Sequence, residues 1–66
     1  MIFEITDLEK NESRVVNIDD KGYEWGKDLA GRYCRVAKHD AHALKGLENP
    51  RLASVRTSGN KYKKVS

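Results

Sequence analysis

The stretch RVVNIDDKGYEWG, residues 14–26, decides the fold because two apolar arms in it flank a tight turn. Asp19 favours the start of a β-turn, and Gly22 tolerates a positive φ near its end. β-Branched and aromatic residues lie on both sides of this turn: Val15, Val16, Ile18, Tyr23 and Trp25. This pattern predicts a β-hairpin over residues 14–26.

The segments on both sides of this hairpin predict further strands. Residues 2–8 alternate apolar and polar side chains, which is typical of a half-buried strand. Residues 32–38 alternate as well. The two faces of that strand are expected to carry Cys34 and Val36 on one side and Tyr33, Arg35 and Ala37 on the other. Residues 52–57 and 61–65 predict the arms of a second hairpin around a turn at residues 58–60.

One short helix is expected near residues 41–46. Asp40 suits the N-cap position, and Gly46 suits the C′ position. Pro50 prevents the helix from continuing, because proline disfavours helical geometry in the residue before it. Leu29, in the connection that follows the first hairpin, is expected to pack inward.

A chain of 66 residues is too short for a second core, so residues 1–66 are expected to form one domain. The pattern predicts a mainly β fold, either a small SH3-like barrel or a strongly bent antiparallel sheet of five to six short strands with one short helix. The strand Gly31-Arg32-Tyr33-Cys34-Arg35-Val36 and the hairpin glycines Gly22 and Gly59 resemble SH3-like barrels, including KOW-type modules, over residues 14–65. This resemblance implies that one barrel face binds nucleic acid or protein, without catalysis.

Composition restricts the function classes. The only cysteine, Cys34, excludes an internal disulfide and indicates a reducing, cytoplasmic compartment. No apolar run exceeds three residues, which argues against a membrane span or a signal-peptide core. No glycine-rich loop has the strand–loop–helix context of a phosphate-binding motif, and Asp19-Asp20 is explained by turn chemistry. We therefore expect no enzymatic activity and no cofactor.

The only metal-like spacing joins Cys34, His39 and His42. A closed zinc site needs four ligands, and the remaining candidate, Asp40, is better used as the helix cap. No metal is therefore expected. Cys34 is predicted to be a buried free thiol, and His39 and His42 are predicted to be surface imidazoles.

Charge is distributed unevenly along the chain. Residues 1–33 carry five basic and eight acidic side chains, whereas residues 34–66 carry eight basic and two acidic ones. Such asymmetry is typical of proteins that bind a polyanion, and it predicts a nucleic-acid-binding module with little sequence preference. The residues expected to contact phosphates are Arg35, Lys38, Arg56, Lys61, Lys63 and Lys64. Tyr33 is the predicted stacking residue, because it shares a strand face with Arg35.

Several alternatives stay open at this point. The lysines and arginines could serve solubility alone. Tyr62 could stack on a base or lie half in the core. Trp25 is expected in the core, as the largest apolar side chain of a small protein. If Tyr23 and Trp25 instead anchor a protein partner, the chain is a small accessory or inhibitor protein of the kind that viruses and mobile elements encode. The protein is expected to be a monomer or a weak homodimer.

Overall fold

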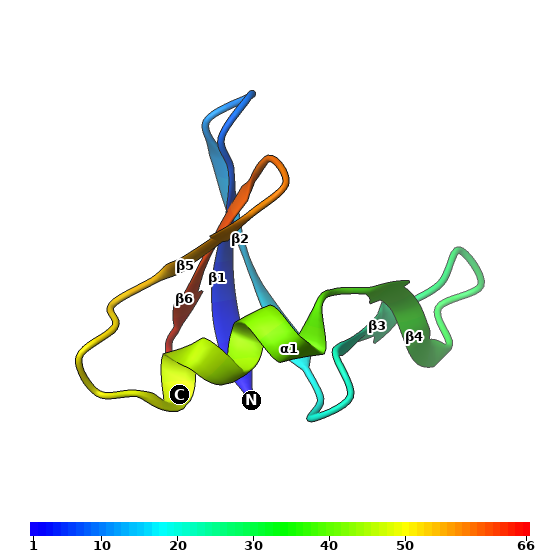
Figure 1. Cartoon of the computed structure of the whole chain (residues 1–66). Helices are drawn as coiled ribbons and strands as arrows, with labels where there is room; N and C mark the ends of the chain where they lie inside the picture. Colours follow the sequence, from blue (N-terminus) through cyan, green and yellow to red (C-terminus); the bar gives the residue numbers. More distant parts are fainter.

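Six strands form one antiparallel sheet in the order β4-β3-β2-β1-β6-β5 (Figure 1). The computed structural model describes residues 1–66. The strands are β1 (Ile2–Asp7), β2 (Glu12–Ile18), β3 (Tyr23–Lys27), β4 (Tyr33–Lys38), β5 (Val55–Thr57) and β6 (Asn60–Lys64). The mainly β prediction is confirmed, and of its two forms the bent sheet is the one observed, because the sheet is not closed into a barrel.

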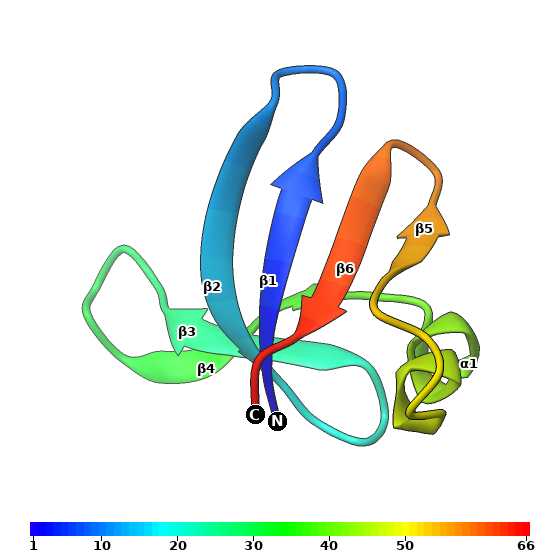
Figure 2. The same ribbon diagram turned by 90° about the vertical axis from the view of Figure 1, so that its left-hand side faces the viewer.

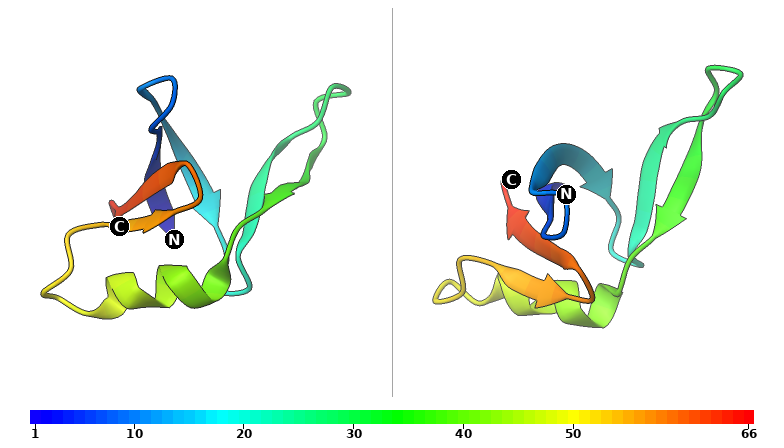
Figure 3. Two further views of the ribbon diagram at one scale, coloured as in Figure 1. Left: turned by 45° about the horizontal axis from the view of Figure 1, so that its top comes forward. Right: turned by 90° about the horizontal axis from the view of Figure 1, so that it is seen from above.

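The sheet bends sharply where β2 meets β3. These two strands share only two residue pairs, Asn17 with Trp25 and Ile18 with Glu24. Beyond them the β3–β4 hairpin runs across the direction of β1, β2 and β6 (Figure 2) and projects away from the rest of the molecule (Figure 3). The radius of gyration is 11.9 Å, against roughly 11 Å for a compact chain of this length. The β3–β4 hairpin is therefore an arm with most of its surface in solvent.

A small core lies between the sheet and one helical segment. The core consists of six buried side chains: Phe3, Ile5, Ile18, Leu44, Leu47 and Tyr62. We call the sheet face that carries Phe3 and Ile5 the inner face and the opposite one the outer face. Because side chains alternate along a strand, the register assigns each remaining strand residue to one of these faces.

The helical segment consists of α1 (Ala41–Leu44) followed by a 3₁₀ turn (Lys45–Glu48). Asp40 is its N-cap as predicted, because its Oδ1 accepts the N–H groups of His42 at 3.0 Å and Ala43 at 3.2 Å. Gly46 directly follows Lys45, the C-cap of α1, as predicted, but it has no positive φ and the chain continues through it into the 3₁₀ turn, so it does not end the helical segment. No helix of the structure is long and apolar enough to cross a membrane.

Leu29 lies at the tip of the β3–β4 hairpin and is fully exposed. The expectation that it packs inward is wrong, because the hairpin extends past the covered part of the sheet and offers Leu29 no apolar surface. The predicted turn from Asp19 to Gly22 is confirmed: the Gly22 N–H donates to the Asp19 carbonyl at 3.1 Å, and Gly22 has φ of 89°.

Gly22→Ala tests how tightly the base of the hairpin is packed. A Cβ atom at Gly22 would lie 2.5 Å from the His39 carbonyl oxygen, in addition to the strain of the positive φ. We expect a loss of about 2–4 kcal/mol in the free energy of unfolding, measured with urea. Gly31→Ala is the matched control, since Gly31 also has a positive φ but has open space around it. It should cost only about 1 kcal/mol; an equal loss in both variants would show that packing at Gly22 adds nothing.

Candidate nucleic-acid interface

A β-bulge in β4 brings two basic side chains onto the outer face of the hairpin. Ala37 pairs with Glu24 and Arg35 pairs with Trp25, which leaves Val36 as an extra residue on β4. Strict alternation predicted Ala37 beside Arg35, and that prediction is wrong because the bulge moves Ala37 to the inner face. Lys38, which pairs with Tyr23, instead joins Arg35 on the outer face. Bulges commonly redirect a side chain in this way next to functional sites.

Both cations lie against Tyr23. The guanidinium carbon of Arg35 is 4.6 Å from the centroid of the Tyr23 ring, and the Lys38 Nζ is 5.5 Å from it. Cations at these distances are attracted to the negative face of the ring. A shallow trough of about 360 Å³ lies beside these three residues and is also lined by Val36 and Ala37. An anion in this trough would meet two positive charges that are already held in place.

The aromatic surface continues toward the hairpin tip. Trp25 and Tyr33 stack with their ring centroids 5.6 Å apart and an angle of 23° between the planes. Tyr33 is 60% exposed, and Trp25 is half-buried. The expectation that Trp25 belongs to the core is wrong, because its neighbour Glu24 takes the inward position of β3. Tyr23, Trp25, Tyr33, Arg35 and Lys38 together form one surface, which we call the basic–aromatic face.

Asp19 accepts hydrogen bonds from two residues of the basic–aromatic face, Tyr23 and Trp25. Its Oδ2 accepts the indole Nε1–H of Trp25 at 2.9 Å, and its Oδ1 accepts the N–H groups of Lys21 and Tyr23, both at 2.9 Å. The bond from Trp25, with the two backbone bonds, lowers the pKa of the Asp19 carboxyl. Asp19 therefore remains ionised, closes the turn and fixes the orientation of the Trp25 ring.

Three of the other predicted phosphate contacts lie toward the opposite edge of the sheet. Arg56 pairs with Lys61, and Lys63 pairs with Glu4, which places these residues on the outer face of β5, β6 and β1. Strands β1 and β2 separate them from the hairpin. Lys64 pairs with Phe3 and so belongs to the opposite face. Of the seven predicted residues, the structure thus brings together Tyr33, Arg35 and Lys38.

A network of four polar side chains, not foreseen from the sequence, lies under the base of the hairpin. Glu24 is only 6% exposed. Its Oε2 accepts a hydrogen bond from the Arg14 Nη1 at 2.8 Å, and its Oε1 lies 2.8 Å from the His39 Nε2. The His39 Nδ1 lies 2.7 Å from the hydroxyl of Tyr62, which is buried in the core. The ion pair with Arg14 and the bond with His39 lower the pKa of Glu24, and Glu24 in turn raises the pKa of Arg14.

This network corrects two predictions. His39 is not a surface imidazole, because its side chain is only 10% exposed and bonded at both nitrogens. Of the two roles considered for Tyr62, stacking on a base and packing in the core, the structure shows the second. Its ring is buried and is not available for stacking. One sequence signal could have found the network: alternation in the first hairpin places the charged Glu24 on the same face as Ile18, where a partner is required.

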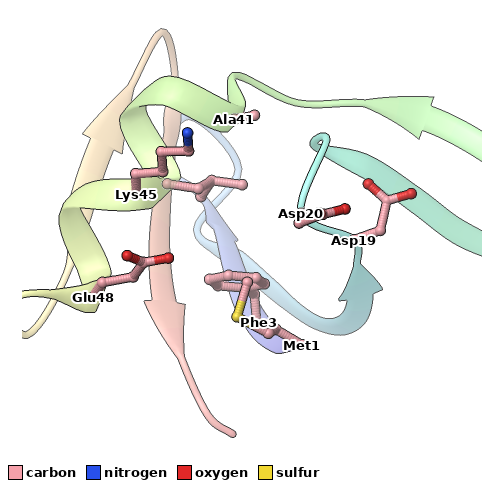
Figure 4. Close-up of a pocket in the computed structure, with 8 residues that line it drawn as sticks. Met1, Phe3, Asp19, Asp20, Ala41, Lys45 and Glu48 are labelled. Carbon is pink, nitrogen blue, oxygen red and sulfur yellow. The ribbon is translucent and has the colours of Figure 1, made fainter.

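No three His, Cys, Asp or Glu side chains are grouped so that they could hold a metal ion. His42 is exposed on α1, and Cys34 is half-buried rather than buried. Figure 4 shows a pocket between α1 and the turn at Asp19 and Asp20, with Phe3 at its floor. Its volume of about 50 Å³ admits a few water molecules and no organic ligand. The basic–aromatic face is therefore the best candidate site.

No protein-family model matches the chain, and no curated protein or solved structure is significantly similar to it.

Glu24→Gln tests the network through its pH dependence. Because folding lowers the pKa of Glu24, its stabilisation is complete above the ordinary carboxyl pKa and is lost as the pH falls through the lowered value. We expect the variant to be less stable than wild type by about 1–3 kcal/mol at neutral pH, with this difference shrinking below about pH 4.

The measurement is urea unfolding between neutral and acidic pH. Glu48→Gln is the control, because Glu48 is exposed and has no ion pair. A difference between wild type and Glu24→Gln that stays constant over the acidic range would contradict the assignment.

Proposed function

We propose that this protein binds nucleic acid through the basic–aromatic face of the β3–β4 hairpin, without catalysis. The observation that carries the proposal is the bulge that sets Arg35 and Lys38 beside Tyr23, next to the stacked pair of Trp25 and Tyr33. The resemblance of residues 14–65 to SH3-like modules implies binding of nucleic acid or protein, although the sheet is open rather than closed into a barrel.

The chemistry of this face suits a polyanion with planar bases. Arginine and lysine contact phosphates and release the counterions that surround nucleic acids. Aromatic rings on the same face can stack on a base or pack on a sugar. Such contacts recognise the backbone and the flat faces of bases rather than base edges, so they confer little sequence preference.

The second basic group, on β5 and β6, supports an extended contact. Arg56 and Lys61 are directly opposite each other on neighbouring strands. Like charges in this position repel one another, and a nearby phosphate would relieve the repulsion. We assign Arg56, Lys61 and Lys63 a secondary role, because Glu4 lies opposite Lys63 and β1 and β2 separate them from the hairpin. Lys64 has no part in this surface.

A protein partner that docks on Tyr23 and Trp25 is the competing proposal, since exposed aromatic residues also anchor protein interfaces. Salt dependence separates the two. Affinity for nucleic acid falls steeply with added salt, by a power that counts the neutralised phosphates. A cytoplasmic location fits either proposal, because the chain carries a single half-buried thiol at Cys34 and no disulfide.

The double variant Arg35→Glu/Lys38→Glu tests the proposed face. We expect it to lower the affinity for short DNA and RNA by more than about tenfold at roughly 50 mM salt, and to reduce the salt slope by about two, because two phosphate contacts are lost. Fluorescence anisotropy between about 50 and 200 mM salt measures both quantities.

Lys10→Glu/Lys45→Glu is the matched control. It changes the net charge by the same amount at two exposed lysines outside the hairpin. Its affinity should fall by no more than about threefold, a long-range effect of net charge. Equal losses in both double variants would show that only net charge attracts the nucleic acid and that the basic–aromatic face is not the site.

A further inference from the structure

The tip of the β3–β4 hairpin carries the most exposed apolar side chain of the protein. Leu29 is fully exposed, more than any other large apolar side chain of the protein. The loop between β3 and β4, to which Leu29 belongs, lies at the end of the arm that projects away from the rest of the molecule (Figure 3). Leu29 therefore contributes no hydrophobic burial to the stability of the folded protein.

The tip is also held in one shape. The Asp28 Oδ1 accepts the N–H groups of Ala30 at 2.9 Å and Arg32 at 3.0 Å. The backbone closes the loop with a bond from the Gly31 N–H to the Asp28 carbonyl and another from the Asp28 N–H to the Arg32 carbonyl, both 3.0 Å. Leu29 is thus presented by an ordered loop, so little conformational entropy would be lost when a partner receives it.

Positive charges flank this leucine on both strands. Lys27 is exposed at the end of β3, and Arg32 is exposed directly before β4. The nearest acidic group, Asp28, is occupied by the loop amides and by Arg32, whose Nε lies 3.4 Å from its Oδ2. Lys27, Asp28 and Arg32 together give the tip a net charge of +1. An apolar tip with this charge, continuous with the basic–aromatic face, fits a partner that has an apolar interior bordered by negative charges.

Duplex DNA has this arrangement, since stacked base pairs lie between two phosphate backbones. Proteins bend DNA by inserting a leucine or a similar apolar side chain between neighbouring base pairs, while cations hold the flanking phosphates. We propose that Leu29 is such a wedge and that the ligand class is duplex DNA that is flexible or already distorted. This inference rests on the proposed function, because the arm must first bind DNA through Arg35 and Lys38.

The test compares duplexes of about 25 base pairs that are either intact or contain a central mismatch. Wild-type protein is expected to bind the mismatched duplex about tenfold more tightly, because part of the unstacking is already done. The fluorescence of 2-aminopurine beside the mismatch should rise on binding as the base unstacks. Leu29→Ala should lose both effects while its affinity for intact DNA changes by less than about threefold, and Leu29→Phe should retain both.

Leu8→Ala is the matched control, since Leu8 is also exposed but follows β1 in an acidic loop. It should behave as wild type. If wild type binds both duplexes equally, or if Leu29→Ala keeps the preference, the wedge is wrong and the proposed function stands. Absence of DNA and RNA binding at low salt would overturn both. Leu29-dependent binding to phosphatidylserine vesicles, without a preference for mismatched DNA, would assign the tip to a lipid surface and overturn the wedge.

Discussion

The chain of contacts from Arg14 through Glu24 and His39 to Tyr62 determines where the β3–β4 hairpin points. Backbone pairing alone would leave the hairpin weakly tied, because β2 and β3 share only two residue pairs. The network links Glu24 of β3 and His39, directly after β4, to Arg14 of β2 and Tyr62 of β6. It therefore attaches both strands of the arm to the rest of the sheet. A backbone bond of 2.7 Å from the His39 N–H to the Gly22 carbonyl adds a fourth connection.

The network is stable because each of its buried polar atoms has a partner. No buried side-chain nitrogen or oxygen in the protein lacks a hydrogen bond. Neutral His39 can donate from Nε2 to Glu24 and accept from the Tyr62 hydroxyl at Nδ1, while protonated His39 can donate from both nitrogens. Both protonation states therefore satisfy the same geometry. With only six buried side chains in the core cluster, such bonds contribute to one defined orientation of the arm.

Local patterns predicted most of the elements. Alternation of apolar and polar residues identified the strands, and it correctly placed Tyr33 on the same strand face as Arg35. The turn from Asp19 to Gly22 and the N-cap Asp40 were recognised from their residue types. The bulge was not predictable, because it depends on how β3 and β4 pair along the whole hairpin. No conformational preference of Val36 itself marks it as the extra residue. Leu29 and Trp25 were misplaced for a related reason: apolar character predicts burial, but an arm that leaves the core has no surface to bury them against.

The grouping of basic residues depends on topology in the same way. In the sequence, Arg35 and Lys38 belong to the same basic half as Arg56, Lys61 and Lys63, but the strand order separates them by β1 and β2. Sequence composition therefore predicted that the candidate surface is positively charged, but not where on the sheet it lies. The same holds for the aromatic residues. Tyr23 and Trp25 precede the basic half in the sequence, and only the pairing of β3 with β4 brings them beside Arg35 and Lys38.

The proposed function depends on whether the outer face of the hairpin binds nucleic acid. A two-dimensional NMR titration of labelled protein with short DNA and RNA tests it most directly. We expect shifts concentrated in β3 and β4, strongest at Tyr23, Trp25, Tyr33, Arg35 and Lys38, that weaken as salt is raised. Shifts centred on β5 and β6, or no shifts at low salt, would contradict it.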